Sequence, residues 1–306
     1  MYGINRCLHI TPSNAKRPPK TEKKCLENEE IMNKLHFPSS LTGQIMRKIL
    51  IICLFVLSAP VAATGDWGST SVHTAGAQVH QKPDFSRILD VSQKKQRFFE
   101  YLMPHIHKAN QTVLRDRANL LSIETRLIAD QALTTEDRAT VQRLSAHYKL
   151  KRLATTDDLT TIKSLLSRID VLPLSLVLAQ AANESGWGTS RFAVQANNYF
   201  GMWCYQKGCG LAPRQRDPGQ NHEVKAFDTV QSNIEAYILN INTHPAYQPL
   251  RTLRQTLREL GTPLRGVLLA EGLMAYSSRG KDYIADIQAL ITANDLDRLP
   301  IELVSN

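Results

Sequence analysis

Residues 172–188 read Leu-Pro-Leu-Ser-Leu-Val-Leu-Ala-Gln-Ala-Ala-Asn-Glu-Ser-Gly-Trp-Gly, and the rest of the chain is organised around this stretch. Pro173 suits the first turn of a helix, where its missing N–H would be unpaired in any case. Good helix formers follow, and Gly186 and Gly188 end the pattern. Apolar residues recur at a three–four spacing, which predicts a helix that is apolar on nearly every side.

Glu184 is the only ionisable residue of this predicted helix and lies in its last turn. A carboxylate there is at the negative end of the helix dipole and beside apolar side chains, and both influences favour its protonated form. A carboxyl group of this kind can donate a proton near neutral pH, so Glu184 is a candidate general acid. The alternative is an exposed glutamate on a fraying last turn.

The charge of the chain does not indicate a nucleic-acid-binding protein. The 306 residues carry a formal net charge of +9, of which +5 lies in residues 1–63. The remaining +4 is ordinary for a soluble domain, so we expect no nucleic-acid partner. The length suffices for one large domain or two modest ones.

The first 83 residues are predicted to lie outside the folded part. Residues 1–45 are polar and lack apolar periodicity, which indicates disorder or a mis-assigned extension. Residues 46–63 combine a charged start, a short apolar run and small residues, and they are typical of a signal peptide cut after Ala63. The apolar run is too short for a stable membrane span, so we expect a periplasmic protein, although an uncleaved anchor is the alternative. Residues 64–83 are expected to be a linker.

Beyond the linker we expect a helical region over 84–160 and a second domain over 161–300. Thr134 and Asp137 suit a capping box before a helix at 139–150. Short strands and turns are expected over 202–227, and further helices over 232–242, 250–260, 263–274 and 282–294. Cys204 and Cys209 are the only cysteines after residue 63, and in an exported chain we expect them to form a disulfide. We expect no metal and no cofactor.

Several motifs resemble the catalytic domains of glycoside hydrolase family 73, which are peptidoglycan-cleaving N-acetylglucosaminidases. They are Ala181-Ala-Asn-Glu-Ser-Gly-Trp-Gly-Thr-Ser190, Asn198-Tyr-Phe-Gly201 and Phe227-Asp-Thr229. Trp203-Cys204, Gly208-Cys-Gly210, His222-Glu-Val, His244-Pro-Ala-Tyr247 and Tyr276-Ser-Ser-Arg279-Gly look closer still to one branch of that family. The resemblance covers about residues 165–295, and residues 84–150 resemble the helical N-terminal region of the same branch.

The resemblance implies a mainly α, lysozyme-like α+β fold with a helical core, a small β lobe and a groove for a glycan strand. It places the general acid at Glu184. It also implies a second carboxylate from the β lobe, for which Glu223 is the first candidate and Asp217 the second, and a tyrosine near the site, Tyr276. Where relatives read Tyr-Ala-Thr-Asp, this chain has an arginine, Arg279, which would put a basic residue near the groove.

Two mechanisms stay open for these residues. Glu223 would activate water and invert the configuration if the two carboxyl groups lie roughly 6.5–9.5 Å apart. Alternatively the N-acetyl group of the substrate attacks, assisted by Tyr276, and configuration is retained. A strand-edge charge at Glu223 and a packed ring at Tyr276 are the structural alternatives. Asn198, Tyr199 and Trp203 are candidate substrate contacts, whereas Trp187 and Phe200 are assigned to packing.

The sequence therefore predicts an exported peptidoglycan hydrolase whose partner is the glycan strand. A lytic transglycosylase could work with Glu184 alone. A non-catalytic wall-binding or scaffold protein that keeps the fold is a third hypothesis.

Overall fold

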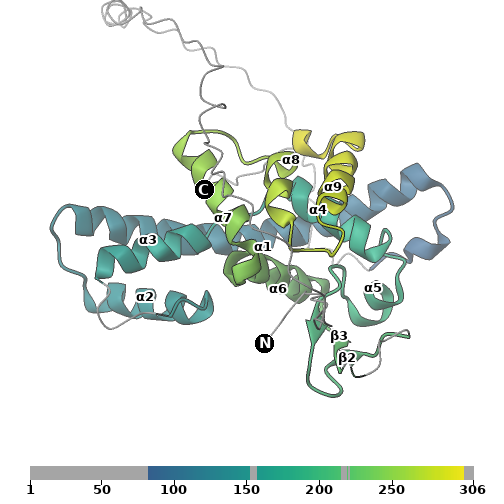
Figure 1. The fold of residues 1–306 in the computed structure, drawn as a ribbon, viewed down its shortest axis with the longest axis horizontal. Coiled ribbons are helices and arrows are strands. Elements are labelled where there is room, and N and C mark those ends of the chain that lie inside the picture. The colour runs from purple at the N-terminus through teal and green to yellow at the C-terminus, as the bar shows by residue number, and fades with distance from the viewer. Residues whose placement is uncertain (1–81, 152–156, 215–218, 220, 300–306) are drawn as a thin grey trace, which may run out of the picture. The chain divides into compact units, whose positions relative to one another are not determined.

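A computed structural model describes residues 82–151, 157–214, 219 and 221–299. Most of these residues are helical, and a small sheet interrupts the helices (Figure 1). The α-helices are α1 (Val91–Ile128), α2 (Thr135–His147), α3 (Asp158–Arg168), α4 (Leu174–Ser185), α5 (Arg191–Ala196), α6 (Val230–Thr243), α7 (Gln248–Glu259), α8 (Gly266–Leu269) and α9 (Lys281–Ala293). Short 3-10 helices lie at Phe85–Arg87, Pro245–Tyr247, Ala270–Leu273 and Leu296–Arg298.

Helix α4 is the predicted helix of the opening stretch. Pro173 is its N-cap rather than its first helical residue, and Gly186 is its C-cap with a φ of 56°. Nine of its twelve residues are buried, so the helix is enclosed on nearly every side, as the apolar spacing predicts. It packs against α1, α8 and α9.

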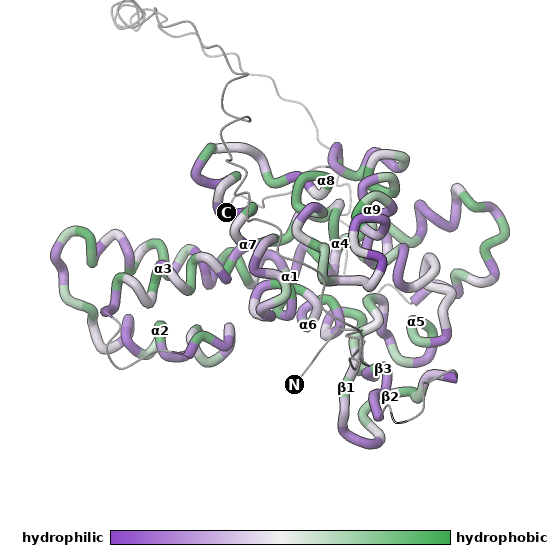
Figure 2. The backbone as a smooth tube through the Cα atoms, viewed as in Figure 1, coloured by the Kyte–Doolittle hydropathy of each residue, from purple (hydrophilic) through white to green (hydrophobic). Residues whose placement is uncertain are grey.

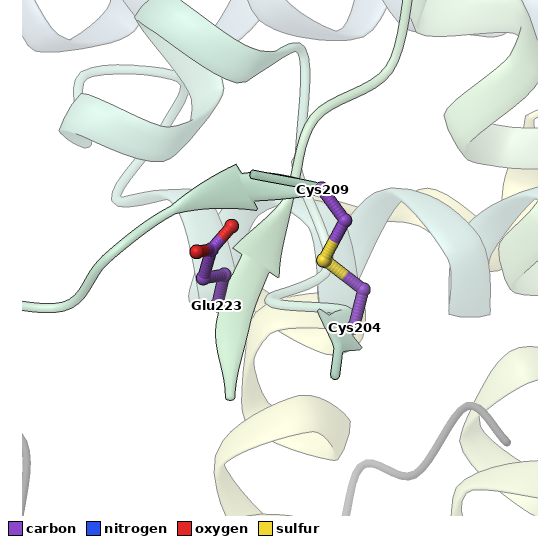
Figure 3. A group of neighbouring side chains, drawn as sticks. All are labelled: Cys204, Cys209 and Glu223. Atoms are coloured by element: carbon purple, nitrogen blue, oxygen red, sulfur yellow. A yellow bond between two sulfur atoms is a disulfide. The ribbon is translucent and has the colours of Figure 1, made fainter. Parts of the chain in front are cut away.

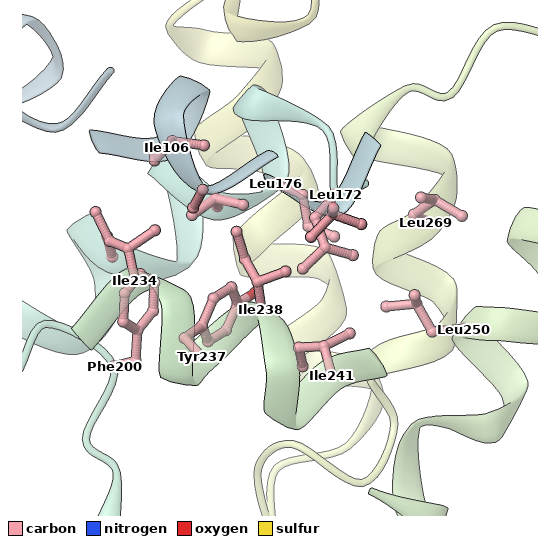
Figure 4. Close-up of a cluster of buried hydrophobic side chains, with 14 of the residues drawn as sticks. Ile106, Leu172, Leu176, Phe200, Ile234, Tyr237, Ile238, Ile241, Leu250 and Leu269 are labelled. Carbon is pink, nitrogen blue, oxygen red and sulfur yellow. The ribbon is translucent and has the colours of Figure 1, made fainter. Parts of the chain in front are cut away.

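Helix α1 is 38 residues long and packs against α3, α4 and α6 (Figure 1). Its buried side chains join those of the C-terminal helices in a single hydrophobic core. Figure 4 shows this core, with labelled side chains from α1 (Ile106), from α4 and the segment before it (Leu176, Leu172), from α6 (Ile234, Tyr237, Ile238, Ile241), and from Phe200, Leu250 and Leu269. Side chains from both sides of the predicted boundary at residue 160 therefore lie in one core.

Arginine side chains cap the C-terminal ends of α2 and α3: Arg168 of α3 donates to the carbonyl oxygen of Tyr148 after α2, and Arg254 of α7 caps α3. The predicted capping box is present, because Thr134 accepts from the N–H of Asp137 while Asp137 accepts from the N–H of Thr134. Arg254 is 1% exposed and donates to the carbonyl oxygens of Arg168 (3.0 Å) and Asp170 (2.9 Å). These bonds satisfy carbonyl groups that the end of a helix leaves unpaired. Hydrophilic and hydrophobic residues alternate around α2 and α3, as expected for helices with one buried face (Figure 2).

The β lobe consists of β1 (Trp203–Cys204), β2 (Gly210–Leu211) and β3 (Glu223–Lys225), all antiparallel, in the order β1-β3-β2. Cys204 and Cys209 are joined by the expected disulfide. A Cβ at Gly210 would lie 1.9 Å from the carbonyl oxygen of Val224, so only glycine fits where β2 approaches β3 this closely.

The mainly α fold with a small β lobe is confirmed, and most of the predicted helices lie within a few residues of their expected ends. The predicted helix at 263–274 is instead short α8 followed by the 3-10 helix at 270–273. Gly266 and Gly272 approach other backbone segments there, since a Cβ at Gly272 would lie 2.3 Å from the Cα of Leu250.

No helix within the described ranges is both long and apolar enough to cross a membrane. The predicted extension (1–45), signal peptide (46–63) and most of the linker (64–83) lie outside the residues the structure describes.

Candidate active site

Glu184 lies in the last turn of α4, and a left-handed turn follows it at once. Gly186, Trp187 and Gly188 all have positive φ angles, of 56°, 58° and 76°. Such angles suit glycine but are unfavourable for tryptophan. The hydroxyl of Ser185 donates to the carbonyl of Ala181 and accepts from the N–H of Gly188 at 2.8 Å, which ties the turn back onto the helix.

The turn is held from outside by residues of the N-terminal part of the chain. The ring of Trp187 meets those of Phe98 and Phe99 edge-on, at centroid distances of 5.6 and 5.5 Å. Phe85 covers Gly188 so closely that a Cβ there would lie 2.4 Å from the Phe85 ring. Helix α1 and the segment before it thus fix the backbone that follows Glu184.

The side chain of Glu184 is partly buried, and burial raises the pKa of its carboxyl group. This direction is the predicted one. The nearby hydroxyl of Tyr283 and the amide of Asn183, which donates to Oε1 at 3.3 Å, oppose the rise in pKa because they favour the charged carboxylate. Burial outweighs them, so Glu184 holds its proton to a higher pH than an exposed glutamate does.

Four tyrosines surround Glu184 closely enough for its charge to raise the pKa of their hydroxyl groups: Tyr237 on α6, Tyr247, Tyr276 and Tyr283 on α9. For each of them burial is the larger cause of the rise. Sequence reasoning identified only one member of this group, Tyr276. Tyr247 ends a motif quoted for the resemblance but was given no role in the site, and nothing in the local sequence distinguishes Tyr237 and Tyr283 from packed tyrosines.

Tyr276 connects this group to the turn at residues 198–201. Its hydroxyl donates to the carbonyl oxygen of Phe200 at 3.1 Å, and its ring stacks on that of Tyr283 at 5.3 Å. A Cβ at Gly201 would lie 3.8 Å from Oε2 of Glu184. The structure therefore brings Tyr276 and the 198–201 turn, both singled out from the sequence, to the Glu184 carboxyl group.

Asn198 and Tyr199, the first two residues of that turn, face inward. Asn198 is 2% exposed, and its amide donates to the carbonyls of Met202 (2.9 Å) and Lys225 (2.8 Å). Tyr199 has no exposed surface, and its ring packs against Phe98. Neither side chain is placed to touch a glycan in this structure. Asn198 instead joins the turn to the β lobe.

Trp203 and Glu223 lie in the β lobe. Trp203 is partly exposed, and its ring stacks on His222 at a centroid distance of 3.8 Å. The carboxylate of Glu223 accepts from the N–H groups of Gly208 (3.0 Å) and Gly210 (2.8 Å) and lies beside the disulfide (Figure 3). The structure thus gives Glu223 a place in holding the loop between β1 and β2.

Of the two remaining predicted residues, the structure describes Arg279 but not Asp217. Arg279 is exposed and forms an ion pair with Asp286 at 2.7 Å. Asp217 lies outside the described residues. In the part of the chain that the structure describes, the one cluster with metal-ligand geometry is Cys204, Cys209 and Glu223. Its two sulfur atoms are bonded to each other, so they are not thiolates that could bind a metal.

Comparison with known proteins identifies the class of domain that the chain carries. Residues 159–296, which contain the Glu184 helix, the β lobe and all four tyrosines, match the Glucosaminidase family model, described as mannosyl-glycoprotein endo-beta-N-acetylglucosaminidase. The protein therefore carries a glucosaminidase domain.

A particular relative extends the match. The chain is 32% identical to the protein Bax of Escherichia coli (strain K12) over 201 residues, which cover 66% of this chain and 70% of that protein. The chain belongs to the family of Bax-like glucosaminidase-domain proteins. No solved structure matches it.

Proposed function

We propose that this protein is an exported peptidoglycan hydrolase that cuts the glycan strand beside N-acetylglucosamine, with Glu184 as the general acid. The observation that carries the proposal is the Glu184 carboxyl group, with its raised pKa, inside the matched domain. Cleavage of a glycosidic bond needs a proton on the leaving oxygen, and an acid that stays protonated toward neutral pH supplies it. Export is proposed on the signal-like segment at 46–63.

The second group of the reaction is proposed to be the N-acetyl group of the substrate, with Tyr276 beside it. Tyr276 is close to Glu184, whereas both oxygens of Glu223 hold backbone amides of the β lobe. An N-acetyl group that attacks the sugar carbon needs no second carboxylate, and water then opens the product. Water activation by Glu223 is the competing route, since each of its oxygens keeps a second lone pair while it accepts a backbone N–H. Trp203 is proposed as a sugar contact because it is a partly exposed aromatic residue of β1.

A site that depends on a single carboxylate also fits a second candidate function, that of a lytic transglycosylase. Such an enzyme needs only one glutamate. Among the described residues, the groups that shift the pKa of Glu184 include no second carboxylate. The two functions differ in their products: hydrolysis leaves a reducing sugar, and transglycosylation leaves an anhydro-muramic end.

The test compares the wild-type protein with Glu184→Gln on purified peptidoglycan, followed by reduction and mass spectrometry of the released fragments. Glu100→Gln is the matched control, since Glu100 is an exposed glutamate on α1. We expect reducing-end N-acetylglucosamine from the wild type and the control, and release slowed by about 100-fold or more in Glu184→Gln. Anhydro-muramic ends would replace the hydrolase with the transglycosylase. Binding without release by any variant would contradict both and favour a scaffold.

A further inference from the structure

We propose that Lys82 is a positioning residue of this site: it holds the end of α5, from which the 198–201 turn runs to the Glu184 carboxyl group. The proposal rests on the proposed function, in which Glu184 transfers a proton. Lys82 is the first residue of the segment 82–88 that precedes α1, and we call this segment the strap. The strap lies about a hundred residues before the turn in sequence and contacts it only in the folded chain.

The ammonium group of Lys82 caps the C-terminal end of α5. It donates to the carbonyl oxygens of Ala193 and Val194, the latter at 2.9 Å, and to Oδ1 of Asn197 at 2.9 Å. The last carbonyl groups of a helix have no partner within the helix, and a cation is favourable at the negative end of its dipole. All three acceptors are neutral. Lys82 therefore fixes the place where α5 ends.

The end of α5 leads directly into the 198–201 turn. Asn197 is the C-cap of the helix, with a left-handed φ of 48°, and its amide donates to the carbonyl oxygens of Phe227 (3.0 Å) and Asp228 (3.2 Å). Four residues further on, a Cβ at Gly201 would lie 3.8 Å from Oε2 of Glu184. Because the backbone between Asn197 and Gly201 is short, a shift at the Lys82 contact would move the turn relative to the carboxyl group.

The strap also holds the left-handed turn that follows Glu184, and one aromatic ring joins the two turns. That ring is Phe98, which has no exposed surface. It meets the rings of Phe85 in the strap, Trp187 in the left-handed turn and Tyr199 in the 198–201 turn, at centroid distances of 5.5, 5.6 and 6.1 Å. The ammonium group of Lys82 lies 5.8 Å from the centre of the Tyr199 ring. Both turns beside the proposed acid are thus packed on the strap and α1.

A turn that moved away from Glu184 would change the acid as well as the geometry. The four tyrosines around Glu184 and the amide of Asn183 are all neutral at neutral pH, and burial is the main cause of the raised pKa. Loosening the 198–201 turn would let water reach the carboxyl group. The pKa of Glu184 would then fall toward its ordinary value, and less of the acid would be protonated near neutral pH.

The first measurement uses the full chain and needs no substrate. Lys82→Met keeps the length of the side chain but removes its donors. In this variant we expect hydrogen exchange at the amides of Tyr199 and Met202, which donate to Asn233 and Asn198, to become about tenfold faster. A carbon-13 NMR titration, assigned by the loss of the signal in Glu184→Gln, should give a lower pKa for Glu184 than in the wild type.

Two variants serve as controls. Lys108→Met, at an exposed position of α1, should leave both the exchange rates and the titration unchanged. Lys82→Arg should restore most of the wild-type behaviour, because a guanidinium group can also donate to the carbonyl groups at a helix end, as Arg254 does at α3. Unchanged exchange and an unchanged titration in Lys82→Met would overturn the proposal.

The second measurement is the pH dependence of peptidoglycan cleavage. In Lys82→Met we expect kcat to fall about tenfold with KM little changed, and the alkaline limb of kcat/KM to move to lower pH. A general loss of stability would lower activity without moving that limb. If exchange and titration change but the wild type cleaves no substrate, the positioning of Glu184 stands and the proposed function fails. If the wild type cleaves and Lys82→Met cleaves equally well, the role of Lys82 fails alone.

Discussion

At the scale of single residues, Glu184 is an acidic group whose surroundings favour its neutral form. Its folded pKa is raised, so the folded protein binds this proton more tightly than the unfolded chain does. The stability that this proton contributes is fully present below the unfolded pKa and is lost as the pH rises through the folded pKa. The wild type therefore loses stability as the pH rises above the unfolded pKa of this group.

Glu184→Gln should for this reason raise Tm at pH 7, while below the ordinary glutamate pKa of 4.5 the difference from the wild type should disappear. We expect a rise of a few degrees, since about 1 kcal/mol corresponds to ~2–4 °C in a domain of this size. Thermal unfolding followed by circular dichroism at pH 4 and pH 7 measures it, with Glu100→Gln as the control. An equal difference at both pH values would show that the effect is not one of protonation.

Some residues of the site could be predicted from the sequence and others could not. Glu184 was predictable because the helix period and its single ionisable residue are local features. Tyr283 was not, because it lies 103 residues beyond Gln180 and meets it only in the folded chain. Asn198 and Tyr199 were predicted to contact substrate because their types suit it, but a residue type does not reveal which way a side chain faces.

At the scale of elements, the β lobe is a very small sheet held by side chains. The disulfide closes the segment between β1 and β2, and Glu223 accepts from two of its amides. The disulfide was predictable from the cysteine count together with the expectation of export. The strand order β1-β3-β2 was not, because strands of two or three residues carry little periodicity.

Glu223→Gln should loosen this segment, since a glutamine offers one acceptor oxygen where the carboxylate offers two. Hydrogen exchange at the amides of Gly208 and Gly210 should become about tenfold faster, while exchange in α4 stays unchanged. Glu259→Gln, at the exposed end of α7, is the control. If exchange is unchanged and cleavage falls as far as in Glu184→Gln, Glu223 is a catalytic carboxylate rather than a holder of the loop.

At the scale of the whole molecule, the family match and the folding unit differ in extent. The match begins at residue 159, yet Phe85, Phe98 and Phe99 hold the turn after Glu184. The apolar spacing of residues 84–150 showed that these helices have a buried face. It could not show that this face packs on α4 and α6.

A chain that begins at residue 159 should therefore not fold cooperatively, whereas a chain that begins at residue 82 should. Loss of α1 would expose the apolar faces of α3, α4 and α6, which it covers in the intact protein. Near-ultraviolet circular dichroism and binding of a hydrophobic dye distinguish a packed core from a loose one. A sharp thermal transition in the shorter chain, at the Tm of the longer one, would contradict this expectation.

The left-handed turn after Glu184 bears on how the motif would change during evolution. In Glu-Ser-Gly-Trp-Gly, the last four residues serve the backbone: Ser185 ties the turn to α4, Gly186 and Gly188 adopt its positive φ angles, and Trp187 packs under Phe98. Only Glu184 serves the proposed chemistry. Selection for folding alone would therefore preserve four letters of the motif. A descendant that had lost catalysis would keep Ser-Gly-Trp-Gly but would tolerate other residues at the position of Glu184. The residue at this position would therefore distinguish active lineages from inactive ones.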